Sequence, residues 1–430
     1  MEAESLAAVR SRYGNWASIS SADGDYRNFA KFEFERVEKE GMGKIEFEIL
    51  GTEKKEKEKG KSKSSRLSLA RLGEISTAFL SPFLLQAPGL PPQKEQDKLL
   101  AWHGAHVQDG WVLRVPENTD AGFVHLRTRA AGHSALHHLI ILEKGASAEV
   151  MIECEGKNTT YINLHTDITE SILGPDARLT LTTVQRYPQK DWSFSHHDQR
   201  LDKFSKLTHT AAAFGAAVSR TRTLNRLAGD HSQAHAYQLF IANGEQFMDM
   251  ETASQHEVPD TQGEMTCRGA LDGKSLGVYR GRIRIERAAP NTISHQSGSA
   301  LLLSEDSAAN IIPSLQVDND QVEAGHGATV GGLDEKELFY LRSRGLDEEK
   351  SRRLVMEGYY LALIAKIPGE KTQEGLRALV RQHLPAYHPS VKHRQKLTVV
   401  ANPGLEARPA AHEGIRDAEL KKNEGKSTRR

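Results

Sequence analysis

Two cysteines are the only thiols available for metal or sulfur chemistry in this 430-residue chain. They are Cys154 and Cys267, and they form no C-x-x-C pair. Zinc sites and cysteine-only iron–sulfur sites need grouped thiolates, so this chain alone can build neither. Both cysteines are expected to be buried structural residues, because free cysteine is among the most buried residue types.

Four histidines share a four-residue spacing, His133 with His137 and His231 with His235. On a helix this spacing can chelate zinc, as in H-E-x-x-H. Here a serine stands where that motif has its general base, and the surrounding segments read as strands or turns. We therefore expect exposed strand histidines rather than a zinc site.

His326 is the histidine that its surroundings single out, in the segment VEAGHGATVGG near the end of a strand-rich region. A neutral imidazole can bind iron and can relay protons near neutral pH. One histidine cannot hold a metal cluster by itself. From residue type alone, a structural histidine at the last β-turn of the chain is the favoured interpretation.

One pair of carboxylates leaves open a second class of function, a carbohydrate-active enzyme. Asp318 and Asp320 could form an acid–base pair, as in a β-solenoid carbohydrate-active enzyme, although an acidic doublet is usually a solvated turn. The chain contains no G-x-x-x-x-G-K-[ST] loop, so any ATP hydrolysis must belong to a partner.

The composition limits the partners and the compartment. Lys plus Arg and Asp plus Glu both number 57, so no net field recruits nucleic acid or an anionic membrane. The first 20 residues lack an apolar core, and no segment approaches the roughly 18–20 apolar residues that span a bilayer. With few cysteines as well, we expect a cytoplasmic protein.

A long strand-rich region must position these residues. From about Gly110 to Gly332, runs such as HHLIILEKGASAEVMIEC alternate apolar and polar residues with a period of two, which is typical of strands. So many strands without crossover helices predict a sandwich, a barrel or a solenoid. Turn glycines give the solenoid some support, because 29 residues separate Gly145 from Gly174, Gly215 from Gly244, and Gly244 from Gly273.

Two helices are predicted after the strands. Asp334 can cap the first helix, and Gly345 can end it. Asp347 starts the second helix, which stops at Pro368 and places its apolar residues roughly on one face: Leu354, Leu361 and Ile364. Together they predict a helical hairpin.

The chain thus divides into four parts. They are a mixed and helical region at 1–105, a strand core at 106–332, a helical hairpin at 333–368 and a polar, partly disordered extension at 369–430. The first part contains a charged run at 53–66, which is predicted to be a solvated loop, and helical character over 67–102.

The segment 322–345, VEAGHGATVGGLDEKELFYLRSRG, resembles the SufB/SufD family. The matching parts are His326–Thr329, Asp334–Glu335 and Leu338–Gly345. Weaker similarity occurs in GLPPQK, GWVLRVPENT, HHLIILEKGASAEV and SLGVYRGRIRIE, so the resemblance covers about residues 89–366.

The resemblance implies a right-handed parallel β-helix with helical ends, in agreement with the strand-rich middle. It also implies a complex with a SufB-type scaffold and a SufC-type ATPase, which build iron–sulfur clusters. ATP would be used only through the ATPase, and a transient cluster would be shared with the scaffold. The ATPase-docking candidates are Leu338, Phe339, Tyr340, Arg342 and Arg344, although Leu338 and Tyr340 could instead pack inside the hairpin.

The resemblance also separates the two family types. The SufB pattern has a cysteine just before a late Leu-Leu run and a glutamate after the histidine. Gly298 and Gly327 stand near those positions here, so the chain resembles the SufD type and is expected to be a non-catalytic subunit. His326 would then lie at the interface with the scaffold, where the partner supplies thiolate. Cys154 stands near the sequence position at which the SufB type carries a sulfur-handling thiol. A homodimer without a SufB-type partner is a further alternative.

Overall fold

A computed structural model describes residues 41–53, 68–74 and 98–386. The charged run after Glu53 and the extension beyond residue 386 lie outside these ranges. Among the described residues, no helix is long and apolar enough to cross a membrane.

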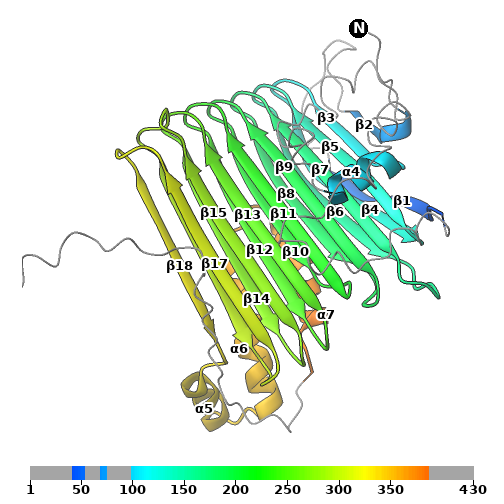
Figure 1. The fold of residues 1–430 in the computed structure, drawn as a ribbon, viewed down its shortest axis with the longest axis vertical. Helices are drawn as coiled ribbons and strands as arrows, with labels where there is room; N and C mark the ends of the chain where they lie inside the picture. Colours follow the sequence, from blue (N-terminus) through cyan, green and yellow to red (C-terminus); the bar gives the residue numbers. More distant parts are fainter. Residues whose placement is uncertain (1–40, 54–67, 75–97, 387–430) are drawn as a thin grey trace, which may run out of the picture. The chain divides into compact units, whose positions relative to one another are not determined.

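The strands form two sheets, and successive strands alternate between them (Figure 1). One sheet has the order β1-β4-β6-β8-β10-β12-β14-β16-β18 and is called here the even sheet; the other has the order β17-β15-β13-β11-β9-β7-β5-β3-β2 and is called the odd sheet. From β3 onward, every neighbouring pair within a sheet is parallel. The chain therefore coils as a parallel β-solenoid, which confirms the predicted fold, while its right hand stays a prediction.

Apart from β3, which has 5 residues, these strands are 8 to 12 residues long. They are β3 (Trp111–Val115), β4 (Asp120–Ala131), β5 (Ser134–Leu142), β6 (Ser147–Gly156), β7 (Leu164–Leu173), β8 (Arg178–Arg186), β9 (Trp192–Leu201), β10 (Lys206–Ala213), β11 (Val218–Leu227), β12 (Gln233–Ala242), β13 (Phe247–His256), β14 (Gln262–Leu271), β15 (Leu276–Ile285), β16 (Ile293–Leu302), β17 (Ala308–Val317) and β18 (Glu323–Gly331).

One coil of the solenoid takes 29 residues around Gly215, Gly244 and Gly273, as predicted, but 31 residues around Gly145 and Gly174, where Ser147 lies opposite Arg178. Gln233 lies opposite Gln262, 29 positions later. Gly244 and Gly273 occupy successive turns on the same side, both with positive φ, and a Cβ on Gly273 would lie 2.9 Å from the Gly244 Cα. Glycine is required there because stacked turns approach too closely for a side chain.

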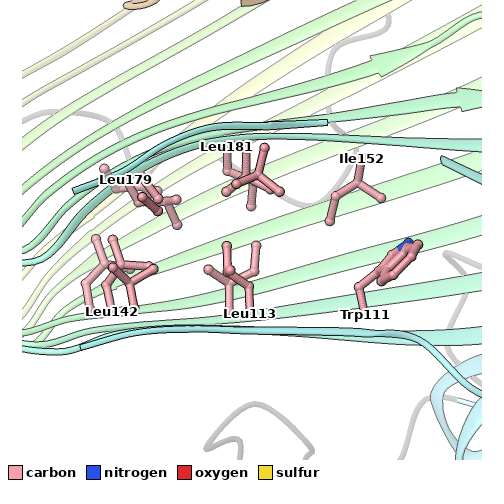
Figure 2. Close-up of a cluster of buried hydrophobic side chains, with 14 of the residues drawn as sticks. Trp111, Leu113, Leu142, Ile152, Leu179 and Leu181 are labelled. Carbon is pink, nitrogen blue, oxygen red and sulfur yellow. The ribbon is translucent and has the colours of Figure 1, made fainter. Parts of the chain in front are cut away.

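Rows of aliphatic side chains fill the space between the sheets in the first coils (Figure 2). Leu113 and Leu142 project inward from the odd sheet, and Leu179 and Leu181 meet them from the even sheet. Burying one such side chain stabilises the fold by about 1.5–3 kcal/mol. The same alternation that predicted strands thus supplies the core.

The two ends of the solenoid differ. At the start, β1 (Lys44–Glu53) pairs antiparallel with β4, and β2 (Ser68–Arg71) pairs antiparallel with β3. At the other end, no described strand pairs with the outer edge of β17 or β18. The helical character predicted from residue 67 onward is wrong for β2, because pairing with the exposed edge of β3 outweighs local helix propensity.

Helices cover parts of both outer faces. Helix α4 (Lys98–His106) packs Leu99 and Leu100 against the odd sheet. Helices α5 (Glu335–Ser343), α6 (Glu348–Ile364) and α7 (Glu370–His383) follow β18, and side chains of α6 and α7 pack with those of the even sheet, including Met151 and Tyr237.

The predicted helix caps are confirmed. The Asp334 carboxylate accepts from Lys336 N at 2.8 Å, the Asp347 carboxylate accepts from Lys350 N at 2.7 Å, and Gly345 has a φ of +92°.

Two expectations about the C-terminal helices differ from the structure. Leu354 does not share the buried face of α6, since it is 50% exposed; that face consists of Ser351, Met356, Tyr360, Leu363 and Ile364. Helix α7 occupies the first part of the expected polar extension, because Leu376, Leu379 and Val380 give it an apolar stripe that buries against the solenoid.

Candidate functional site

The exposed end of the solenoid presents His326. The residue lies on β18, the last strand of the even sheet, opposite Gln296 of β16, and its side chain is exposed. The companion strand β17 exposes apolar side chains, with Ile312 at 41%, Leu315 at 37% and Val317 at 40%. An unpaired strand edge with apolar side chains is a surface on which another chain can pair.

A groove of about 780 Å³ lies beside this end, between α5, α6 and the last turns. Tyr340 and Leu354 line it, and both are exposed, by 56% and 50%. Phe339 is exposed by 72% on the same helix.

The five docking candidates separate into one buried residue and four exposed ones. Leu338 is 1% exposed and packs in the core of the C-terminal helices. Arg344 lies over the ring of Tyr340, with its guanidinium carbon 5.2 Å from the centroid, and Arg342 pairs with Glu348 at 3.0 Å. The hairpin-packing alternative therefore holds for Leu338 and not for Tyr340.

The paired histidines form no zinc site in the described structure, yet the expectation that they are exposed is wrong for one pair. His133 and His137 are buried, and Leu164 N donates to His133 Nδ1 at 2.9 Å. His137 contacts His103 of α4, at 3.3 Å between ring nitrogens, and Glu170 at 3.1 Å. Helix α4 covers this outer face, so an outward-pointing strand side chain is buried here.

A serine, a histidine and an aspartate line up inside the first coils. Ser134 Oγ lies 2.8 Å from His165 Nδ1, and His165 Nε2 lies 3.1 Å from the Asp191 carboxylate. The order matches a nucleophile, a base and an orienting acid. All three side chains are fully buried, so no substrate can reach the hydroxyl, and the line serves packing and hydrogen bonding.

A second buried group consists of His138, Cys154 and Asp167, whose ligand atoms lie within 4.8 Å of one another. Burial raises the pKa of the Cys154 thiol well above its usual value, so the sulfur is a protonated thiol and a poor nucleophile. Cys267 is likewise buried and free, which confirms the prediction of burial for both cysteines. In the sequence, only the polar residues at inward-facing strand positions could have indicated this group.

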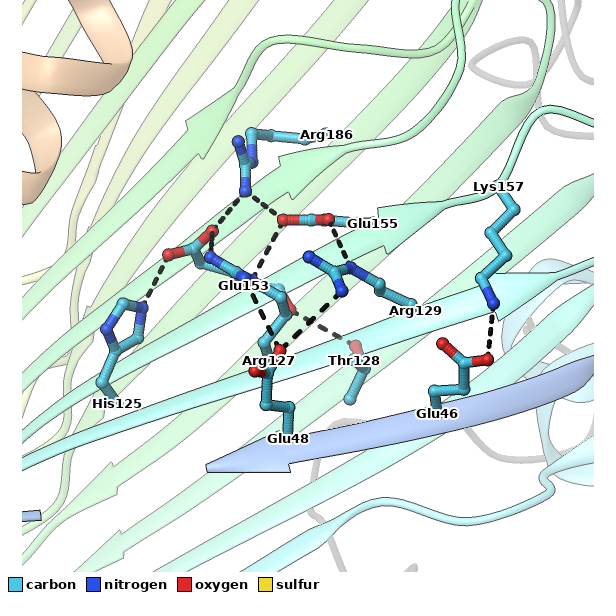
Figure 3. Close-up of polar contacts among 10 residues, drawn as sticks. All are labelled: Glu46, Glu48, His125, Arg127, Thr128, Arg129, Glu153, Glu155, Lys157 and Arg186. Atoms are coloured by element: carbon cyan, nitrogen blue, oxygen red, sulfur yellow. Dashed lines mark hydrogen bonds and ion pairs between the residues drawn. The ribbon is translucent and has the colours of Figure 1, made fainter. Parts of the chain in front are cut away.

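An ion-pair network crosses the outer face of the even sheet at its start (Figure 3). Glu153 accepts from His125 Nε2 at 2.6 Å and from Arg186 at 2.5 Å, and Arg127 lies 3.4 Å away. Burial alone would raise the pKa of Glu153, but the hydrogen bond from His125 and the charges of Arg186 and Arg127 outweigh it and hold the pKa at about 2. Arg127 also reaches Glu48 of β1, so the network ties the antiparallel first strand to the solenoid.

Comparison with known proteins shows which family this chain belongs to. The family model described as "SUF system FeS cluster assembly, SufBD core domain" matches residues 125–359, which is more than half of the chain. This chain belongs to the SufB/SufD family.

Curated relatives agree with this assignment. An iron–sulfur cluster assembly SufBD family protein of Mycobacterium tuberculosis is 29% identical over 262 residues, covering 59% of this chain and 65% of the relative. One from Pyrococcus horikoshii is 28% identical over 279 residues, covering 64% and 62%. The iron–sulfur cluster assembly protein SufD of Bacillus subtilis is 26% identical over 298 residues, covering 67% of each. The chain thus spans slightly less than two thirds of the first two relatives.

Packing around Gly298 fits the SufD type. A Cβ at this position would lie 2.5 Å from Ile311 Cγ2 and 2.8 Å from Tyr279 Cδ1, so the coil has no room for the cysteine that the SufB pattern carries nearby. A Cβ at Gly327 meets no atom of the described residues within 4 Å, so the missing glutamate beside His326 has no such steric cause in this part of the chain. The chain is a SufD-type member of its family.

We predict that Gly298→Cys destabilises the protein by about 1–3 kcal/mol, because its side chain overpacks the contact with Ile311 and Tyr279. Urea unfolding measures the loss, and Gly327→Ala, whose Cβ points into open space, is the matched control. An unchanged unfolding midpoint for Gly298→Cys would contradict the packing argument.

We predict a pH-dependent stability difference between wild type and Glu153→Gln. Because the folded pKa of Glu153 lies near 2, below its ordinary 4.5, its stabilisation is complete above pH 4.5 and is lost as the pH falls toward 2. Glu153→Gln should unfold about 2 kcal/mol more easily at pH 7, allowing for partial solvent screening, and the gap should close in acid.

Urea midpoints at pH 7, 5, 4 and 3 measure this gap. Glu48→Gln is the control, since Glu48 belongs to the same network with its side chain 51% exposed, and should change little. A gap that is the same at every pH would refute the role of the Glu153 charge.

Proposed function

We propose that this chain is a non-catalytic SufD-type subunit of an iron–sulfur cluster assembly complex. It would pair with a thiolate-bearing SufB-type scaffold and bind a SufC-type ATPase, and the nascent cluster is their cargo. The observation that carries the proposal is the open end of the solenoid, where His326 lies on β18, a strand whose outer edge has no partner strand among the described residues, in a chain of this family.

The end of the solenoid supports the scaffold interface. The outer edges of β17 and β18 offer backbone donors and acceptors, and Ile312, Leu315 and Val317 offer apolar surface for burial. His326 is exposed within that surface, so its imidazole can reach a ligand position shared with the partner. The partner must supply thiolate, because Cys154 and Cys267 are buried.

The groove beside α5 supports the ATPase interface. Interfaces concentrate binding energy in aromatic and arginine side chains next to a rigid element, and Phe339, Tyr340, Arg342 and Arg344 meet that description. Closure of two ATPase subunits on each other would pull on α5 and α6, which pack on the even sheet. This pull would move this solenoid relative to the solenoid of the SufB-type partner. Entry of iron and sulfur at the His326 interface would follow that movement.

The alternatives have less support. Asp318 and Asp320 are exposed in a turn, and Asp318 lies 3.7 Å from Arg284, as expected for a solvated doublet rather than a glycosidase pair. Pairing of two identical copies through the same open end would leave the interface without exposed thiolate. Since both cysteines are free, we extend the proposal to a reducing compartment, the cytoplasm.

We predict that His326→Ala lowers the iron and sulfide content of the complex without breaking it. The chain is coexpressed anaerobically with SufB-type and SufC-type partners, and iron and sulfide are measured per complex after sizing. Loss of the imidazole should reduce both by about tenfold or more. His295→Ala is the matched control, since His295 is also an exposed histidine near this end but pairs with Glu323.

Undiminished iron and sulfide in the His326→Ala complex would remove the proposed role of His326. A stable cluster on the isolated chain would overturn the shared-site proposal as a whole.

We predict that replacing Phe339 and Tyr340 together by alanine weakens ATPase binding by 30-fold or more, since truncating an aromatic anchor typically loses about 1–2 kcal/mol. The dissociation constant for the SufC-type partner measures this, and thermal unfolding checks that the helices stay folded. Phe204→Ala is the control, because Phe204 is an exposed phenylalanine in a turn away from α5. Unchanged affinity in the double variant would exclude this docking surface.

A further inference from the structure

A small cavity lies between the two sheets, next to Cys154. Its volume is about 20 Å³, and His138 and Asp167 of the odd sheet and Cys154 of the even sheet all line it. These side chains are 1%, 3% and 6% exposed. The group plays no part in the proposed function, which uses only the exposed end and the helices.

The hydrogen bonds around His138 fix what the cavity can hold. Trp111 N donates to His138 Nδ1 at 3.1 Å, so Nδ1 is the acceptor and the proton of the neutral ring lies on Nε2. His138 Nε2 is buried and has no hydrogen-bond partner among the residues that the structure describes. A metal ion on Nε2 would require the proton to move to Nδ1, where it would face the Trp111 N–H, so the ring opposes a cation.

The cavity has the size and polarity for one water. About 10–15 Å³ of such volume holds a water molecule, and a buried water needs two to four polar partners. His138 Nε2–H can donate to it, the Asp167 carboxyl can accept from it, and the Cys154 thiol offers a weak third contact. Leaving the buried His138 N–H without a partner would destabilise the fold.

We propose that one water occupies this cavity and joins His138, Asp167 and Cys154 into a single proton-sharing cluster. Tyr187 completes the cluster from outside the cavity, since its hydroxyl donates to Asp167, with oxygen–oxygen distances of 3.0 and 2.8 Å. The cavity thus binds a water molecule, and the side chains around it exchange protons through that water.

The charge of the cluster changes at Asp167. The titratable groups facing it are His138 from β5, Cys154 from β6, Tyr187 after β8 and His197 from β9. Burial lowers the pKa of His138 and of His197 to about 3 and raises the pKa of Cys154 and of Tyr187 well above their usual values, so none of these four changes charge near neutrality.

Burial raises the pKa of Asp167 itself to about 7, against the opposing hydrogen bond from Tyr187. The carboxyl therefore loses its proton between about pH 6 and pH 8 and becomes a stronger acceptor for the water and for the Cys154 thiol.

Infrared spectroscopy of the S–H stretch tests the cluster in the full chain, because this band lies apart from other protein bands. Cys267 is the matched control: it is also fully buried and protonated, but lies among apolar residues such as Met250 and Phe240. Cys154→Ala and Cys267→Ala assign the two bands. We expect the Cys154 band at lower wavenumber, shifting further between pH 6 and pH 8 while the Cys267 band stays fixed. Asp167→Asn should abolish that shift.

Two outcomes would overturn the proposal. If the S–H bands of Cys154 and Cys267 coincide and do not shift with pH, Cys154 is not hydrogen-bonded to a titrating group. A missing Cys154 S–H band would show a thiolate held by a cation in place of the water. The pH titration of the wild-type S–H bands distinguishes these outcomes from the expected shift even where Asp167→Asn does not fold. A crystal structure at neutral pH should show one solvent peak between His138 and Asp167.

Discussion

Each strand of a parallel solenoid depends on its neighbours for backbone hydrogen bonds, and the last coil has a neighbour on one side only. That constraint organises the molecule. At the first coil, β1 and β2 run antiparallel to the solenoid strands and occupy the free edges. At the last coil, the outer edges of β17 and β18 have no partner strand within the described chain, and the side chains of these two strands are more exposed than those of the other parallel strands. The role proposed for His326 depends on its position at this open end.

The interior obeys a second constraint, since polar groups between two sheets must find partners away from bulk water. The first coils satisfy it with aliphatic rows at one edge and with hydrogen-bonded side chains such as Ser134, His165 and Asp191 at the other. The same enclosure makes Cys154 a protonated thiol. A sulfur atom in that state suits a structural neighbour of Asp167 better than an acceptor of sulfur from a passing donor.

Sequence patterns predicted those features that depend on local alternation. Period-two runs identified the strands, and Asp334 and Asp347 were recognisable as helix caps because the capping interaction is confined to a few residues. Features decided by distant packing were missed. Nothing near residue 68 indicates that β3 will need an antiparallel partner, and nothing near His137 indicates that α4 will cover it. Helix α7 could have been predicted from the sequence, because Leu376, Leu379 and Val380 have helical spacing.

The antiparallel strand β1 has a consequence for the size of assemblies. A solenoid open at both ends could join head to tail without limit and grow into a fibre, because each added copy would present a fresh edge. Here the ionic network around Arg127 and Glu48 helps hold β1 across the first edge, so the strand that a further solenoid would meet there runs antiparallel to the coil. Head-to-tail growth that adds parallel strands through β17 and β18 would therefore have to pair with an antiparallel first strand.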